Sequence, residues 1–107
     1  MSKERFEFDG LIVGDCKALE ITVAEAQDIK RGDLLIASGD NFVKDTAGAE
    51  AGKVYCVAAE DVNTSDGAKT SVAYFSGDFS KEKVTEQASK ASEYVLATQG
   101  IYLVEVR

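Results

Sequence analysis

Apolar and polar residues alternate in several stretches of the 107-residue chain, and this period of two is typical of β-strands with one buried face. Between residues 17 and 23, Leu19, Ile21 and Val23 fall on one side of such a strand, and polar residues fall on the other. The alternation therefore predicts a half-buried strand here, with the three apolar side chains on its core face.

A hairpin and a central strand come next in the pattern. Residues 34–37 are apolar enough for a strand, residues 38–41 (Ser-Gly-Asp-Asn) supply a turn, and Phe42 and Val43 return as the partner strand. Residues 54–59 are too uniformly apolar for a strand with one face in water. This segment is predicted to lie in the centre of a sheet and to be covered on both faces.

The second half of the chain adds a strand, a helix and a last strand. Residues 61–69 are rich in turn formers and precede a strand at 70–75. After Ser80, a good helix N-cap, apolar residues recur at helical spacing until Gly100 ends the pattern. These residues are Val84, Ala88, Ala91 and Val95. With a final strand at 101–106, the sequence predicts a mainly β chain with one short helical segment, an α+β fold.

The first fifteen residues carry more apolar side chains than a solvated tail needs. Charged and aromatic residues alternate from Glu4 to Asp9, and an apolar run from Leu11 to Val13 follows. Exposed apolar clusters of this kind usually mark contact surfaces. The residues alone leave two interpretations open: a first strand of the domain's own sheet, or an arm that lies on a partner.

Composition indicates one folded, acidic domain. The chain is 45% hydrophobic and 29% charged, as in ordinary soluble proteins, and its length suits a single core. Its formal net charge is −7, without a run of Lys or Arg that could follow a phosphate backbone, so nucleic acid is not expected as a direct partner. The longest apolar stretch, residues 54–59, is far too short to span a membrane, and the first ten residues lack the apolar region of a secretory signal. The sequence predicts a protein made in the cytoplasm, without a membrane segment.

Candidate catalytic and metal-binding residues are few. The chain has no histidine, which removes the commonest general base and metal ligand. Cys16 and Cys56 are not in a CxxC arrangement and are expected to be unpaired thiols, one of them buried in a strand. Asp61, Asn63 and Asp66 lack the spacing of a calcium loop. No catalytic residue, metal or cofactor is expected.

The tripeptide Arg31-Gly32-Asp33 matches a cell-adhesion motif. A match of three residues has little specificity. In a protein made in the cytoplasm, the expected structure is a charged turn with glycine at its bend.

The segment from Lys53 to Phe79 resembles part of a known family. A buried apolar strand with an acidic end (VAAED), a turn rich in Thr and Asp, and a second strand that ends in YFSGDF follow one another there. Further along, ATQGIYLVEV places small residues before the last strand. In this order the elements resemble those of the lambda-type head decoration proteins, which clamp onto the outside of tailed-bacteriophage capsids.

This resemblance implies a fold, a function and a set of contact residues. The fold would be a small β-clip or β-tulip-like domain at residues 16–107, preceded by an extended capsid-binding arm at residues 1–15. Homotrimers would bind the major capsid protein at three-fold and quasi-three-fold positions of the expanded head and stabilise it against internal DNA pressure. The protein would be non-enzymatic and would belong to the virion, on the outer capsid surface. The arm residues implied to touch the capsid are Glu4, Arg5, Phe6, Phe8, Leu11 and Ile12.

Two other functions compete with capsid decoration. One is a β-module of a phage structural component that binds a small ligand or a glycan, which an exposed group of aromatic residues around a pocket would favour. The other is an enzyme that uses Cys16 or Cys56, which the lack of histidine disfavours. The aromatic candidates for a ligand site are Tyr55, Tyr74, Phe75, Phe79, Tyr94 and Tyr102, most of them in expected strands or in the helix.

Overall fold

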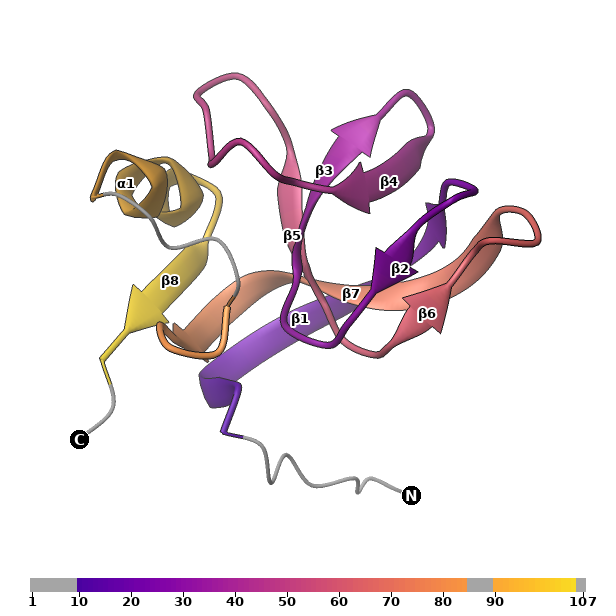
Figure 1. The fold of residues 1–107 in the computed structure, drawn as a ribbon. Coiled ribbons are helices and arrows are strands. Elements are labelled where there is room, and N and C mark those ends of the chain that lie inside the picture. The colour runs from indigo at the N-terminus through magenta and orange to yellow at the C-terminus, as the bar shows by residue number, and fades with distance from the viewer. Residues whose placement is uncertain (1–9, 85–89, 106–107) are drawn as a thin grey trace.

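The structure is a computed structural model that describes residues 10–84 and 90–105. Within these ranges the chain is mainly β-strand with one short helix, as the sequence predicted (Figure 1). The strands are β1 Ile12–Val23, β2 Asp28–Ile29, β3 Leu34–Ser38, β4 Asn41–Lys44, β5 Tyr55–Ala58, β6 Val62–Asn63, β7 Lys69–Ser80 and β8 Ile101–Val104, and helix α1 spans Lys90–Thr98.

Five strands close into a small barrel. The hydrogen-bonded order β1-β4-β3-β5-β7 returns to its start because β7 also pairs with β1, antiparallel, from Ile12↔Phe79 to Val23↔Lys69. The β1–β4 seam is much shorter, a parallel contact with Val23↔Phe42 as its registered pair. Among the described strands, most of β1 therefore has a paired neighbour on one side only.

Strand β7 is long enough to pair both with the barrel strands and with β8. Its first half pairs with β5, and its second half pairs in parallel with β8, from Gly77↔Ile101 to Ser80↔Val104. Helix α1 packs beside β8 (Figure 1). The helix ends before Gly100, whose φ of 89° is a conformation that glycine adopts without strain.

Apolar side chains collect in two clusters. The inner cluster lies within the barrel and contains Ile21, Val23, Ile29, Leu35, Cys56, Ala58 and Ala73. The outer cluster lies on the opposite face of the sheet, towards α1, and contains Leu11, Leu34, Tyr55, Val57, Tyr74, Phe79, Val84, Leu96 and Ile101. Strand β5 contributes alternate residues to both clusters, and all four of its side chains are buried. The prediction of a central strand covered on both faces is thus confirmed for residues 55–58, whereas Val54, predicted as part of it, lies before the strand and is 51% exposed.

The hairpin and the last strand also agree with the sequence. Ser38 lies opposite Asn41, with Gly39 at a φ of 64° in the turn, and β8 occupies the start of the segment predicted as the final strand. The connection at 24–30 and the loop at 61–69 are only partly irregular, because they contain β2 and β6, which pair at Ile29↔Val62.

The predicted helix does not include residues 80–84. Ser80 is not its N-cap: it is the last residue of β7, is 5% exposed, and its amide donates to the Leu11 carbonyl at 2.8 Å. Val84 is buried in the outer cluster, but it lies in the turn after β7. Ala88 falls outside the described residues. The prediction failed because a side chain buried from a turn can produce the same apolar spacing as a helix.

Candidate functional site

The residues expected to touch a capsid fall into two groups. Four of them, Glu4, Arg5, Phe6 and Phe8, lie outside the described residues. The other two, Leu11 and Ile12, lie where the chain joins the sheet.

Leu11 and Ile12 belong to the folded domain. Leu11 is 1% exposed in the outer cluster, and Ile12 is the first residue of β1, opposite Phe79. The assignment of Leu11 as a capsid contact is therefore corrected, because a side chain buried in the core offers no surface to a partner. Residues 12–15 were predicted either as part of an arm or as a strand of the domain's own sheet, and the structure shows the strand. The sheet therefore begins within residues 1–15, the segment predicted as the arm.

Both ends of the described chain leave the same end of the sheet. The amide of Ser80 donates to the Leu11 carbonyl and the amide of Lys81 donates to the Val104 carbonyl, each at 2.8 Å, so the end of β7 lies between the two (Figure 1). Partly exposed apolar residues at this end are Val13, Tyr102 and Val104, at 49%, 50% and 36%. Apolar side chains left in water beside the start of the sheet make this end a candidate contact surface.

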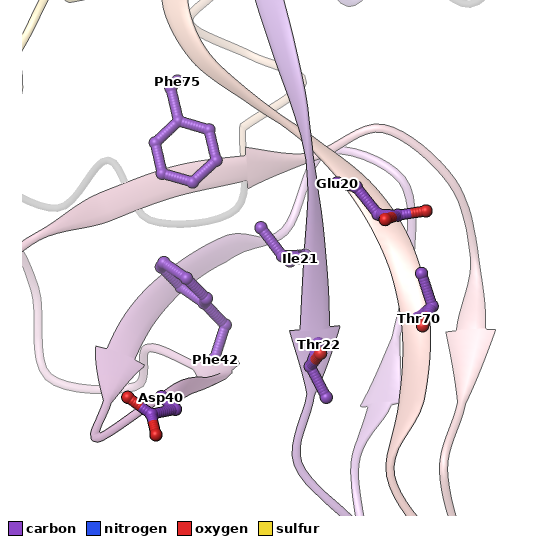
Figure 2. A pocket seen from close by; sticks show the side chains of 7 residues that line it. All are labelled: Glu20, Ile21, Thr22, Asp40, Phe42, Thr70 and Phe75. Carbon is purple, nitrogen blue, oxygen red and sulfur yellow. The ribbon is translucent and has the colours of Figure 1, made fainter.

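A second candidate site is a hollow of about 330 Å³ at the β1–β4 seam, called the seam hollow below (Figure 2). Phe42 and Phe75 meet edge to face there, with ring centroids 5.7 Å apart and ring planes at 87°. Ile21 lies on the same side of β1 as the two rings, whereas Glu20 and Thr70 lie on the other side. The residues that line the hollow are Glu20, Ile21, Thr22, Asp40, Phe42, Thr70 and Phe75.

Leu19 is 60% exposed, although it alternates with Ile21 and Val23, which are 8% and 0% exposed. The prediction that all three lie in the core is wrong for Leu19. The cause is the position of β4, which begins at Asn41 and meets β1 at Val23, too far along to cover Leu19. Alternation in the sequence shows which residues share a face of a strand, but not how far the adjacent strand extends along it. The seam hollow therefore could not be predicted from the sequence.

The Arg31-Gly32-Asp33 turn is folded against the barrel. Nη1 of Arg31 donates to the Tyr74 hydroxyl at 3.1 Å, and the guanidinium carbon lies 5.7 Å from the centre of the Tyr74 ring. Asp33 is 2% exposed and pairs with Lys44 at 3.2 Å. The tripeptide is a structural turn, as predicted, and it engages both of its charged side chains within the protein.

Cys16 and Cys56 are unpaired thiols, as predicted. Burial raises the pKa of Cys56 to about 12, and burial together with the nearby Asp15 charge raises the pKa of Cys16. A raised pKa keeps a thiol protonated at neutral pH, and the protonated form is a poor nucleophile. Both thiols thus have surroundings that disfavour the thiol-enzyme alternative.

Two of the polar residues that lack calcium-loop spacing, Asp61 and Asn63, accept hydrogen bonds from backbone amides. Asp61 accepts a hydrogen bond from the Arg31 amide at 2.8 Å, and Asn63 accepts one from the Ser65 amide at 3.0 Å. Within residues 10–84 and 90–105, no three His, Cys, Asp or Glu side chains gather where they could hold a metal ion. In the same part of the chain, no helix has the length and apolar character needed to cross a membrane.

The aromatic residues considered for a glycan site are dispersed. Three belong to the outer cluster: Tyr55, Tyr74 and Phe79. Phe75 lines the seam hollow, and Tyr94 and Tyr102 are 68% and 50% exposed. Of the six aromatic candidates, only Phe75 lies in the lining of the seam hollow, and it contacts Phe42, which was not among them.

Comparison with known proteins finds no family whose model matches this chain and no matching curated protein. The likeness of residues 53–79 to head decoration proteins therefore rests on the order of the segments themselves. In the structure, VAAED begins in β5, and YFSGDF lies within β7, the neighbouring strand.

Proposed function

We propose that this chain is a non-enzymatic decoration protein of a tailed-bacteriophage capsid. As a homotrimer it binds the major capsid protein on the outer surface of the expanded head and stabilises the head against internal DNA pressure. Residues 1–10 form the attachment arm, with contacts from Glu4, Arg5, Phe6 and Phe8, and half-buried Ile12 adds a contact at the start of β1. The β-clip or β-tulip likeness is part of the same proposal.

The observation that carries the proposal is the anchoring of the chain directly behind the arm. Leu11 is buried at 1% exposure and its carbonyl accepts the Ser80 amide at 2.8 Å, which fixes the point where residues 1–10 meet the domain. Val13 and Tyr102 keep about half of their surface in water at this end, at 49% and 50%. An anchored base lowers the ordering cost of binding, and the exposed apolar groups add area that a partner can cover.

The proposed mechanism is thermodynamic linkage. A protein that binds only the expanded arrangement of capsid subunits stabilises that arrangement by mass action. Three arms on one trimer also strengthen attachment, because each further arm binds at a high effective concentration. Within each arm, Phe6 and Phe8 act as apolar anchors while the extended backbone pairs with a capsid sheet edge.

The test is co-sedimentation with expanded, undecorated heads of the phage that encodes the protein. The full chain is compared with a form that begins at Gly10 and with the double variant Phe6→Ser and Phe8→Ser. We expect the full chain to sediment with heads and both altered forms to stay in the supernatant. Circular dichroism of all three should be alike, because the changes leave Leu11 and β1 intact.

A longer truncation, to a form that begins at Val13, would not separate loss of binding from loss of folding. It removes Leu11 from the core, and deleting a buried leucine side chain costs about 2–5 kcal/mol. Binding retained by the form that begins at Gly10 would refute the arm. Failure of the full chain to bind heads would refute decoration altogether.

A second candidate function, a small-ligand or glycan-binding β-module, is favoured by one observation. The seam hollow combines two aromatic rings with the hydroxyls of Thr22 and Thr70 and the carboxylate of Asp40 in its lining. Apolar surfaces with a few polar groups are common in ligand sites. A glycan array probed with the full chain and with Phe42→Ser tests it, and equal signals for both would exclude this site.

A further inference from the structure

Strand β1 offers an unpaired edge beside the seam hollow. Along one side it pairs with β7 residue by residue from Ala18 to Val23. On its other side, the registered partner is Phe42, opposite Val23. Within residues 10–84 and 90–105, none of the residues Ala18–Thr22 therefore has a registered strand partner on this second side. An unpaired edge is a template for another strand.

The length of this edge is limited at both ends. Register shifts interrupt the β1–β7 ladder before Cys16 and again between Lys17 and Ala18, and irregularities of this kind twist an edge away from a partner. At the other end, β4 already occupies the edge at Val23. A guest strand thus fits beside Ala18–Thr22, and only a short one.

The two faces of the edge differ in chemistry. On one face Leu19, 60% exposed, precedes Ile21, which lies with the rings of Phe42 and Phe75 in the seam hollow (Figure 2). Glu20 lies on the other side of β1. Because side chains alternate along a strand, a guest would place one row of side chains over the apolar face and the next row beside Glu20.

Charge further restricts the guest. The hollow's lining contains two carboxylates, Glu20 and Asp40, and no basic residue. Neither carboxylate forms an ion pair or a side-chain hydrogen bond within the described part of the chain. The whole chain carries a net charge of −7, which favours a basic guest segment over an acidic one.

We propose that the edge Ala18–Thr22 and the seam hollow bind an extended segment of another protein, in which apolar residues alternate with Lys or Arg. The segment adds to β1 as a strand, and its backbone hydrogen bonds set the register. Its apolar side chains cover Leu19 and enter the hollow, and its basic side chains lie beside Glu20. This site is distinct from the arm and does not depend on capsid attachment.

The test is an NMR titration of the full chain with a capped hexapeptide of alternating lysine and valine. We expect shift changes to cluster at the amides of Ala18–Thr22, Phe42 and Phe75. Leu19→Asp should weaken binding at least tenfold, because it places a charge on the apolar face. Val13→Asp is the matched control: it adds the same charge to β1 at a similarly exposed residue, 49%, beyond the register shifts, and should change affinity less than twofold.

Two further comparisons separate the parts of the proposal. Glu20→Lys should reverse the preference, so that a hexapeptide of alternating glutamate and valine binds the variant better than it binds the original chain. In an extended hexapeptide, the valine N–H groups point to one edge of the strand and the lysine N–H groups to the other. Methylating every valine nitrogen, or every lysine nitrogen, therefore removes the hydrogen-bond donors of one edge. At least one of these two methylated peptides should bind the chain tenfold more weakly than the parent peptide.

Three results would overturn the proposal. These are no shift change at millimolar peptide, shift changes away from Ala18–Thr22, and equal losses in Leu19→Asp and Val13→Asp. If both N-methylated peptides bind as tightly as the parent, strand addition is wrong. The titration uses no capsid, so its failure and the failure of head binding are independent results.

Discussion

Replacing Gly77 by alanine tests how closely β1 crosses β7. Gly77 has a φ of 141°, and a Cβ at this position would lie 2.5 Å from the Asp15 carbonyl oxygen and 2.6 Å from the Cys16 Cβ. Both neighbours belong to the irregular part of β1, where Cys16 lies opposite Gly77. Backbone atoms held in a ladder cannot move aside as the end of a flexible side chain can.

Two costs add in Gly77→Ala. An alanine held at this positive φ costs about 1–3 kcal/mol, and a methyl group forced into packed neighbours costs about 1–3 kcal/mol more. We therefore expect the free energy of unfolding to fall by about 4 kcal/mol, from a total of about 5–15 kcal/mol for a domain. Gly67 is the matched control, because its φ is 133° and no atom lies within 4 Å of its Cβ position. Gly67→Ala carries only the first cost, about 2 kcal/mol.

Urea unfolding followed by circular dichroism measures both variants, since the chain has no tryptophan for fluorescence. With a slope of roughly 1.5 kcal/mol per molar urea, a difference of about 2 kcal/mol separates the two midpoints by about 1.3 M. Equal midpoints for Gly77→Ala and Gly67→Ala would refute the reasoning, because the two positions differ in the neighbours of the added methyl group.

Two other substitutions test the interior. Tyr55→Phe removes the hydroxyl that accepts a hydrogen bond from the Glu50 amide at 2.7 Å. We expect the free energy of unfolding to fall by about 1–2 kcal/mol and amide hydrogen exchange to become faster across residues 46–53. Unchanged exchange in these residues would contradict this prediction. The pKa of Cys56 is raised to about 12, so the thiol of the unfolded chain ionises first, above its ordinary pKa of 9.0, and stability falls as pH rises from 9 towards 12. In Cys56→Ala the urea midpoint should fall less steeply between pH 8 and 11. Some pH dependence should remain, because Cys16 and Tyr55 also have raised pKa values. An unaltered slope of midpoint against pH would contradict the assignment to Cys56.

Local patterns predicted those parts of the fold that neighbouring residues decide. The two-residue turn after Ser38 follows from Gly39, and the burial of β5 on both faces follows from its uniformly apolar residues. In both cases the required information lies within a few positions of the chain. The same holds for the end of α1 at Thr98, shortly before Gly100.

Predictions failed where a distant segment decides burial. Leu19 is exposed because β4 starts too far along to reach it, and Leu11 is buried because β7 and the outer cluster enclose it. The seam hollow joins side chains from β1, β4 and β7 that no short window of sequence brings together. Sequence pattern indicated that the first residues were unusual, but not the point at which the sheet begins.

The long β1–β7 ladder has a mechanical consequence. Nine registered pairs connect the two strands, and the Ser80 amide donates a hydrogen bond to the Leu11 carbonyl at the end where the described chain begins. Tension applied through residue 10 along the axis of β1 would load these pairs in shear, so that they resist together. Tension across the strands would instead part them one at a time. Under the proposed attachment to a capsid, the domain would resist outward pressure best if the pull on residue 10 followed the axis of β1.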